Sequence, residues 1–292
     1  MRESRFECVV VIGCGKIAVT AIKYIASLRE NYRFALRFMQ HEIQEMTAIR
    51  KVCVENYIDF ISIPDKGAMT EALMQLQGNT LIVSAGNYYL FPKELLEKQN
   101  ITVINFHNAL LPKYPGRNAP SWAIYYDEKQ SGATWHLVSV EVDAGEIIWQ
   151  KACRILPDMK AYELTARIME LAQEGLEEFF EMLLQGQILT RKQEKSDNRR
   201  MFYAKEIPAR GRLKMTDDPA YIYRVLRALD YGKMGPFPAT LLELDKEHLV
   251  EVQRYKKVCV RAQEQQEGVK NLIEITLDED SMLQIKYKEK EN

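Results

Sequence analysis

Two polar residues, Asn105 and His107, follow a short β-branched run and are of types that can do chemistry together. The run at 101–104 predicts a buried strand, and open parallel sheets usually place ligands at the carboxyl ends of their strands. If strand geometry continues, residues two apart leave the same side of the backbone. A carboxamide is a fixed, uncharged hydrogen-bond donor, and an imidazole exchanges protons near neutral pH. The pair therefore predicts a catalytic or ligand-binding site at the end of this strand.

A rigid loop and an acidic turn come after this pair. Pro112, Pro115 and Gly116 interrupt any regular element and force a shaped loop. Further along, Asp143 and Gly145 form a sequence that is typical of a turn. Asp143 could act in the site or could simply cap this turn.

The first 185 residues or so alternate strands and helices, which predicts a Rossmann-like, doubly wound, mostly parallel sheet of the α/β class. The predicted strands are residues 8–12, 34–39, 60–63, 81–83, 101–104, 133–140 and 147–155. The predicted helices begin after the first strand and include residues 44–55, 68–76, 120–126 and 161–184, with a further one starting at Pro92. Such a sheet would bring polar strand ends together along one edge.

A glycine turn after the first strand has two interpretations. Gly13, Gly15 and Ala18 fit the dinucleotide-binding fingerprint, and Glu42, after the second strand, could contact a ribose. The same turn also serves any tight connection from a strand to a helix. A nicotinamide-dependent oxidoreductase therefore stays open as an alternative of another class.

The chain divides at residues 191–200, a charged and polar stretch without apolar residues that predicts a linker. Residues 1–190 would form the first domain. Residues 201–292 predict a helix at 220–229 and short strands at 240–244, 251–262, 272–277 and 282–288. We expect a small C-terminal β-rich domain with an OB-like or barrel-like arrangement.

The composition indicates an ordinary soluble protein of 292 residues, 47% of them hydrophobic and 28% charged. A net charge of −1 gives no electrostatic case for binding nucleic acid or an anionic membrane. No apolar run approaches the ~20 residues that span a bilayer, and the N-terminus lacks a signal-peptide pattern, so we expect a cytoplasmic location. Five scattered cysteines without a CxxC motif argue against a disulfide framework or a zinc site.

Taken together, the motifs resemble the formyltransferase family that uses 10-formyltetrahydrofolate. This family includes methionyl-tRNA formyltransferases, glycinamide ribonucleotide transformylases and nucleotide-sugar N-formyltransferases. The resemblance rests, in family order and spacing, on Asn105 with His107, Leu110 to Pro112 with Gly116 and Pro120, Gly132 to Thr134, and Asp143 with Gly145. Residues 211–214 and the β-rich tail resemble, more loosely, the C-terminal part of the longer members. Asn108 and Ala109 replace the residues that often follow the family histidine.

The resemblance implies an enzyme that transfers a formyl group from 10-formyltetrahydrofolate to a primary amine without a metal. Asn105 would stabilise the oxyanion of the tetrahedral intermediate, and His107 would handle protons. Asp143 would orient or charge-stabilise His107 and receive the amine proton. His136, which shares a predicted strand with Trp135, is interpreted as a packing or supporting residue.

The resemblance also implies where the substrates bind. The folate would lie between the loop after strand 81–83 and the turn before Asp143, held largely by backbone groups. The residues expected near it are Leu81, Ser84, Gly86, Asn87, Tyr88, Tyr89, Val140 and Glu141. Lys16, Arg117 and Asn118 are candidates for contacting the acceptor.

Several acceptors remain open. A small-molecule or carrier-bound amine is expected, either an amino-sugar nucleotide or an aminoacyl group. The nearly balanced charge of the tail argues against initiator tRNA, because RNA binding requires neutralisation of phosphates. A methionyl-tRNA formyltransferase, a formyltetrahydrofolate hydrolase and an RNA-binding module without turnover are the further alternatives.

Overall fold

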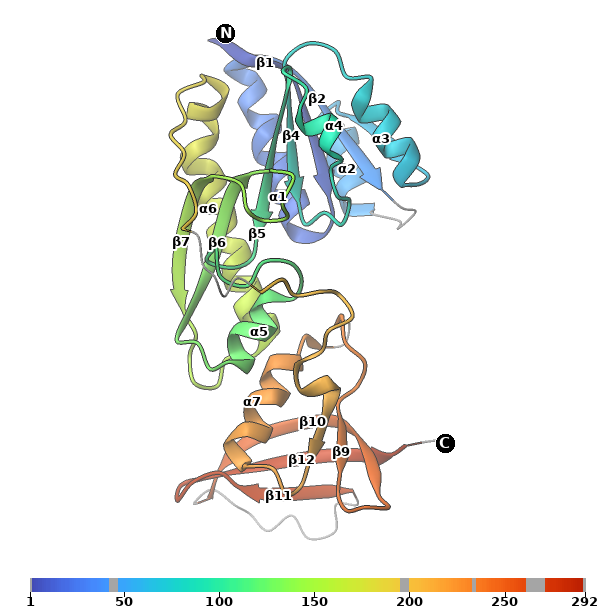
Figure 1. Ribbon diagram of the computed structural model, residues 1–292, viewed down its shortest axis with the longest axis vertical. Helices are drawn as coiled ribbons and strands as arrows, with labels where there is room; N and C mark the ends of the chain where they lie inside the picture. Colours follow the sequence, from blue (N-terminus) through green and yellow to red (C-terminus); the bar gives the residue numbers. More distant parts are fainter. Residues whose placement is uncertain (1, 42–46, 195–199, 233–234, 261–270, 291–292) are drawn as a thin grey trace. The chain divides into compact units, whose positions relative to one another are not determined.

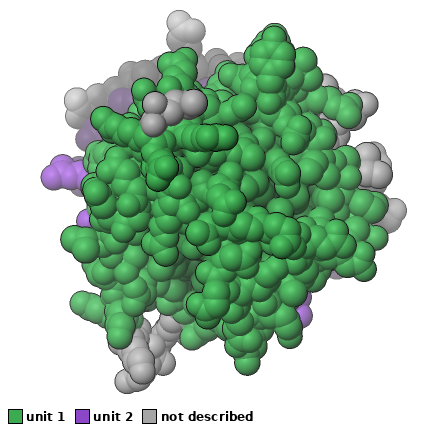
Figure 2. Space-filling model, turned by 90° about the horizontal axis from the view of Figure 1, so that it is seen from above, with its two compact units in different colours: residues 1–116, 131–153, 166–201 green, residues 117–130, 154–165, 202–292 purple. Residues whose placement is uncertain are grey.

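The computed structural model describes residues 2–41, 47–194, 200–232, 235–260 and 271–290. Two compact units can be distinguished, and Figure 2 colours them separately. Unit 1 contains residues 1–116, 131–153 and 166–201, and unit 2 contains residues 117–130, 154–165 and 202–292. The sequence had assigned 117–130 and 154–165 to the first domain. The first stretch belongs to unit 2 because helix α5 (Ala119–Tyr125) packs against helix α7 (Pro219–Leu229). The second belongs to it because the Tyr162 N–H donates to the carbonyl of Asp230 and Arg227 donates to the carbonyl of Met159.

The described part of unit 1 contains a seven-stranded sheet with strand order β3-β2-β1-β4-β5-β6-β7 (Figure 1). Strands β3, β2, β1, β4 and β5 pair in parallel, whereas β5 and β6 are antiparallel, as the predicted mostly parallel α/β sheet requires. The strands are β1 (Arg2–Gly13), β2 (Tyr32–His41), β3 (Asp59–Ile63), β4 (Thr80–Ala85), β5 (Ile101–His107), β6 (Gln130–Leu137) and β7 (Ile147–Arg154).

The helices of the first 190 residues follow the predicted alternation, with small shifts at their ends. They are α1 (Gly15–Ser27), α2 (Thr47–Glu55), α3 (Lys66–Met74), α4 (Lys93–Leu96), α5 and α6 (Ala161–Leu184). The α6 bounds coincide with those predicted from its apolar spacing. Glu42, the candidate ribose contact, and residues 44–46 of the predicted second helix lie outside the described residues.

The core of unit 1 is built on the continuous apolar run of β1, whose residues Val9 to Ile12 are fully buried. A strand that is covered on both faces needs apolar side chains at every position. On one face, Val10 and Ile12 pack in a cluster with Met69 and Leu73 of α3. The aspartate side chain at the N-cap of α3 accepts a hydrogen bond from a first-turn N–H, which fixes where this covering helix begins.

The strand that carries the candidate pair extends further than predicted. β5 continues through Asn105 to His107, so both residues belong to the strand and do not follow it. In the register of the sheet, Asn105 pairs with Ser84 of β4 on one side and with His136 of β6 on the other. The predicted strand at 133–140 ends earlier, at Leu137. These pairings position the candidate site.

Unit 2 has a five-stranded sheet in its described residues, with strand order β11-β12-β10-β9-β8. Its strands are β8 (Arg212–Lys214), β9 (Leu241–Glu243), β10 (Leu249–Cys259), β11 (Leu272–Thr276) and β12 (Ser281–Glu289). The predicted small β-rich part is confirmed, but strand β8 was not among the predicted strands. Helix α7 begins at Pro219 behind an Asp218 side-chain cap and buries Ile222 and Val225 in the core of this unit.

No helix of the described residues is both long enough and apolar enough to cross a membrane.

The glycine turn after β1 provides a test of the fold. A Cβ at Gly13 would collide with the carbonyl of Ala85 in β4, whereas a Cβ at Gly15 would meet nothing within 4 Å. Gly15 has a φ of +69°, so alanine there meets only the cost of a left-handed backbone. We expect Gly13→Ala to lower the free energy of unfolding by about 3 kcal/mol and Gly15→Ala by about 1 kcal/mol, measured by urea denaturation. Equal losses would contradict the close approach of β1 and β4.

Candidate active site

Three side chains form a hydrogen-bonded row across β4, β5 and β6. The Ser84 hydroxyl donates to Asn105 Oδ1 at 2.7 Å. On the other side, Asn105 Nδ2 lies 3.2 Å from His136 Nε2. These are the residues that the sheet register places opposite one another, so the row follows from strand pairing.

The hydrogen bonds of His136 fix how the Asn105 carboxamide is turned. His136 Nδ1 lies 2.8 Å from the carbonyl oxygen of Leu137, which can only accept, so Nδ1 carries the hydrogen. In the neutral imidazole, Nε2 is then an acceptor and receives an Asn105 N–H. The amide oxygen faces Ser84, the amide nitrogen faces His136, and the second Asn105 N–H is left for a ligand.

His107 is held by the loop that follows it and by the acidic turn. Its Nε2 donates to the carbonyl oxygen of Tyr114 at 2.8 Å, and its Nδ1 lies 3.5 Å from Asp143 Oδ2. Since a carbonyl can only accept, Nε2 keeps its hydrogen and Nδ1 is the position where a proton can be exchanged. The His107 side chain is 5% exposed, so this exchange takes place in a largely desolvated setting.

Asp143 lies between the two imidazoles. Its Oδ1 is 3.5 Å from His136 Nε2, and its Oδ2 also accepts the backbone N–H of Gly116 at 2.7 Å. Burial by itself raises the pKa of this carboxyl. The positive charge of His107, that of His136 when its imidazole is protonated, and the hydrogen bond from the Gly116 N–H together outweigh burial and hold the Asp143 pKa well below its usual range. Asp143 is therefore an ionised carboxylate.

The loop between His107 and Gly116 is tied to β6 and β7 by its own hydrogen bonds. Thr134 Oγ1 donates to the carbonyl of Ala109 at 2.6 Å and accepts the N–H of Leu111 at 3.3 Å. Gln150 Nε2 donates to the carbonyl of Leu111 at 2.9 Å and to Thr134 Oγ1 at 2.8 Å. The loop that supplies the Tyr114 carbonyl and the Gly116 N–H is thus fixed in place.

The residues predicted near the folate lie in different environments. The Leu81 side chain is fully buried within β4, and Tyr89 is 5% exposed and hydrogen-bonded to Thr70 at 2.7 Å. These two side chains face the core, so their burial does not support the predicted contact with a ligand. The Ser84 hydroxyl donates a hydrogen bond to Asn105, so Ser84 orients the Asn105 carboxamide.

The remaining residues of that set lie on loops. Gly86 has a φ of +70°, and the Asn87 side chain bonds the backbone of Tyr89 within its own loop. Tyr88 is 58% exposed and Val140 is 63% exposed, and Glu141 is also exposed. The exposed aromatic and apolar side chains after β4 and β6 could contact the face of a flat ring.

The three acceptor candidates are divided between the units. Lys16 is exposed in the first turn of α1, in unit 1. Arg117 and Asn118 belong to unit 2, where the Arg117 N–H donates to the carbonyl of Phe202 at 2.8 Å and Asn118 precedes α5 with a φ of +57°.

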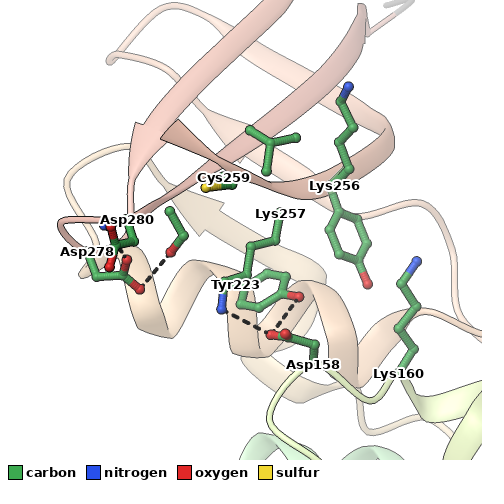
Figure 3. Close-up of a pocket in the computed structure, with 11 residues that line it drawn as sticks. Asp158, Lys160, Tyr223, Lys256, Lys257, Cys259, Asp278 and Asp280 are labelled. Carbon is green, nitrogen blue, oxygen red and sulfur yellow. Dashed lines mark hydrogen bonds and ion pairs between the residues drawn. The ribbon is translucent and has the colours of Figure 1, made fainter. Parts of the chain in front are cut away.

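A separate hollow of about 790 Å³ lies in unit 2 (Figure 3). Its polar side chains are largely bonded to one another. Lys257 Nζ lies 3.4 Å from Asp158 Oδ1, and the Tyr223 hydroxyl donates to the same oxygen at 3.2 Å. The Ser281 hydroxyl donates to Asp278 at 2.6 Å. A ligand would have to replace these bonds, so we do not include the hollow in the candidate site.

Residues 58–179 match the family model described as formyl transferase. This segment contains the row on β4, β5 and β6, His107 and Asp143. The chain carries a formyl transferase domain. The family predicted from the sequence motifs is therefore confirmed.

A curated relative of this chain is the methionyl-tRNA formyltransferase of Clostridium novyi (strain NT). It is 31% identical over 198 residues, which are 64% of this chain and 63% of the relative. The methionyl-tRNA formyltransferase of Geotalea daltonii is 27% identical, and the match covers 54% of its length. The chain thus spans less than two thirds of the curated relatives that it matches.

Solved structures share the fold of nearly the whole chain. The N-formyltransferase of Helicobacter canadensis, determined with folinic acid and dTDP-3-aminofucose, aligns with a TM-score of 0.72 at 15% identity, covering 97% of this chain and 100% of that one. At this identity the likeness concerns the fold, and it confirms the predicted Rossmann-like architecture of the formyl transferase domain.

Some contacts of this site have no signal in the local sequence. His136, predicted as a packing or supporting residue, lies 3.2 Å from Asn105 Nδ2 and 3.5 Å from Asp143 Oδ1, so it contacts both residues. The direct pairing of Asn105 with His136 arises from the antiparallel β5–β6 register, which no local pattern shows. The Tyr114 carbonyl is a backbone group and has no signal in the residue type.

The low pKa of Asp143 predicts an acid-sensitive contribution to the stability of the formyl transferase domain. Because the folded-state pKa lies below the unfolded value of about 3.9, the contribution is fully present above about pH 4 and is lost as the pH falls. Asp143→Asn should lower the free energy of unfolding by about 2 kcal/mol at pH 7, and the difference from wild type should shrink below pH 4. Urea unfolding from pH 7 to pH 3 measures this. A difference that is independent of pH would contradict an ionised, buried Asp143.

Proposed function

We propose that this protein transfers the formyl group of 10-formyltetrahydrofolate to a primary amine. The observation that carries the proposal is the convergence of Asn105, His107 and an ionised Asp143 within a formyl transferase domain. Family membership alone would leave the active residues open. The geometry supplies a hydrogen-bond donor, a proton-exchanging imidazole and a carboxylate side by side.

Asn105 is suited to stabilise the charge that develops on the formyl oxygen during attack by the amine. Its carboxamide is oriented before any substrate arrives, because Ser84 fixes the oxygen and His136 fixes one N–H. The remaining N–H can donate without reorganisation. Preorganised donors of this kind stabilise a developing charge more strongly in a desolvated site than in water.

His107 and Asp143 are suited to move the protons. The attacking amine must lose a proton and the leaving folate nitrogen must gain one. His107 Nδ1 faces Asp143 Oδ2 at 3.5 Å, so an imidazolium with its proton on Nδ1 is paired with the carboxylate. Asp143 can receive the amine proton directly or through water, while the Tyr114 carbonyl keeps the imidazole in position.

The proposed folate site consists of the loops after β4 and β6. Exposed Tyr88 and Val140 offer an aromatic and an apolar surface for a pterin ring, and neighbouring backbone groups can bond its polar edge. Bound there, the folate supplies the formyl carbon and the leaving nitrogen. Within the described ranges, no three His, Cys, Asp or Glu side chains are grouped to hold a metal ion.

For the acceptor, we propose an amino-sugar nucleotide or an aminoacyl group on a small molecule or carrier. The match over the full length of an N-formyltransferase structure determined with dTDP-3-aminofucose supports the first class, and the methionyl-tRNA formyltransferase relatives favour an aminoacyl acceptor. A net charge of −1 does not favour tRNA itself. The formyl transferase match also favours formyl transfer over a nicotinamide-dependent reaction.

The experiment that tests the function follows tetrahydrofolate release from 10-formyltetrahydrofolate with a panel of amino-sugar nucleotides, aminoacyl carriers and charged tRNA. We expect release that depends on one class of amine and that is lost in His107→Ala. Release without any amine would indicate a hydrolase. Binding of NAD(H) with no consumption of the formyl donor would refute the proposal.

Two variants separate the oxyanion donor from the residue that orients it. Asn105→Ala should lower kcat by about 10²–10³-fold, because it removes the preorganised donor. Ser84→Ala should lower kcat by only about tenfold, because His136 still holds one N–H of the carboxamide. Steady-state kinetics at saturating donor compares them. If Ser84→Ala were as damaging as Asn105→Ala, Ser84 would have to act on the substrate itself.

A further inference from the structure

The predicted linker begins with residues that are bonded to the active-site turn. We call residues 190–193 the strap. Arg191 forms an antiparallel bridge with Ile147, whose two backbone hydrogen bonds measure 2.8 and 2.9 Å. The Thr190 hydroxyl bonds the Glu146 carboxylate. The strap therefore lies along the chain that leaves the Asp143 turn.

Gln193 of the strap bonds the backbone on both sides of this turn. Its Nε2 lies 2.8 Å from the carbonyl oxygen of Asp143 and 2.7 Å from that of Gly145. Both partners are acceptors only, so each of the two amide hydrogens is used. Gln193 Oε1 is buried and has no hydrogen-bond partner among the described residues, so these two bonds are the hydrogen bonds that hold the side chain.

The turn needs such support because its backbone conformation is unfavourable for residues other than glycine. Asp143 has a φ of +53°, a left-handed conformation in which Cβ crowds the carbonyl. Nearby, a Cβ at Gly145 would collide with the carbonyl of Leu137, so the turn lies tightly against the end of β6. This conformation points the carboxylate of Asp143 at His107, His136 and the Gly116 N–H.

The strap also reaches the loop on the other side of His107. Arg191 donates to Gln150 Oε1 at 2.6 Å, and the amide of Gln150 donates to the carbonyl of Leu111 at 2.9 Å. One short segment is therefore bonded to the turn that carries Asp143 and, through Gln150, to the loop that carries the Tyr114 carbonyl and the Gly116 N–H.

We propose that Gln193 is a positioning residue that holds the Asp143 turn in its active conformation, a role that rests on the proposed function. Its side-chain hydrogen bonds go to the backbone of the turn, so it acts through the turn backbone. Residues 191–200, predicted as a solvated linker, thereby contribute at their beginning to the active site.

Two substitutions of similar length distinguish this role from simple space filling. Gln193→Met keeps the length of the side chain and removes both donors. Gln193→Lys places an ammonium group, which can donate to the two carbonyls, at about the same distance. Lys192→Met, at the exposed neighbouring position, is the matched control.

We expect Gln193→Met to lower kcat by about 10- to 100-fold with a much smaller change in KM, because displacing a catalytic group by about an ångström has effects of this size. Gln193→Lys should keep most of the activity, and Lys192→Met should match wild type. Wild-type turnover is measured first, since its absence would refute the proposed function and not the role of Gln193.

A second readout does not depend on turnover. The carboxyl ¹³C resonance of Asp143, assigned by its absence in Asp143→Asn, is followed against pH. Its pKa should lie well below the usual range in wild type, Gln193→Lys and Lys192→Met. In Gln193→Met it should rise toward the usual value, because the carboxylate moves away from His107, His136 and the Gly116 N–H. Wild-type kcat and an unchanged Asp143 titration in a folded Gln193→Met protein would overturn the proposal.

Discussion

The register of three neighbouring strands is the constraint on which the candidate site depends. Ser84, Asn105 and His136 lie opposite one another on β4, β5 and β6, so their side chains meet in one row. A shift of one residue in either pairing would turn the members of this row to opposite faces of the sheet. The pairing of β5 with β4 and β6 therefore fixes the orientation of the Asn105 carboxamide. The neighbouring residues Val83 and Ile104 are fully buried in the core of the same sheet.

The second constraint on the site is the electrostatic stabilisation of the Asp143 carboxylate. Burial opposes the charge of Asp143, and two imidazoles and a backbone N–H overcome that opposition. These groups come from β5, β6 and the loop after β5. Neither the turn nor the loop is a regular element, and both are fixed by side chains from elsewhere in unit 1, Gln193 for the turn and Gln150 for the loop. The sheet positions the hydrogen-bond donor Asn105, and the hydrogen-bonded turn positions the carboxylate of Asp143.

The glycine turn after β1 has a structural explanation. Gly13 lies where β1 approaches β4 so closely that a Cβ would meet the Ala85 carbonyl. The close approach accounts for this glycine without a bound dinucleotide. It also explains why a fingerprint that fits a nucleotide-binding turn can occur without a nucleotide: both need a tight passage from a buried strand to a helix.

The sequence by itself determined the alternating α/β pattern, the long helix α6 and the family, because apolar periodicity and motif spacing are local properties. It also indicated Asn105, His107 and Asp143, whose residue types limit their chemistry. Only the tertiary structure decided that His136 contacts Asn105, that Leu81 and Tyr89 face the core, and that 117–130 belongs to unit 2. Those outcomes depend on strand register and on packing between segments distant in the chain, which a single sequence does not encode in any local pattern.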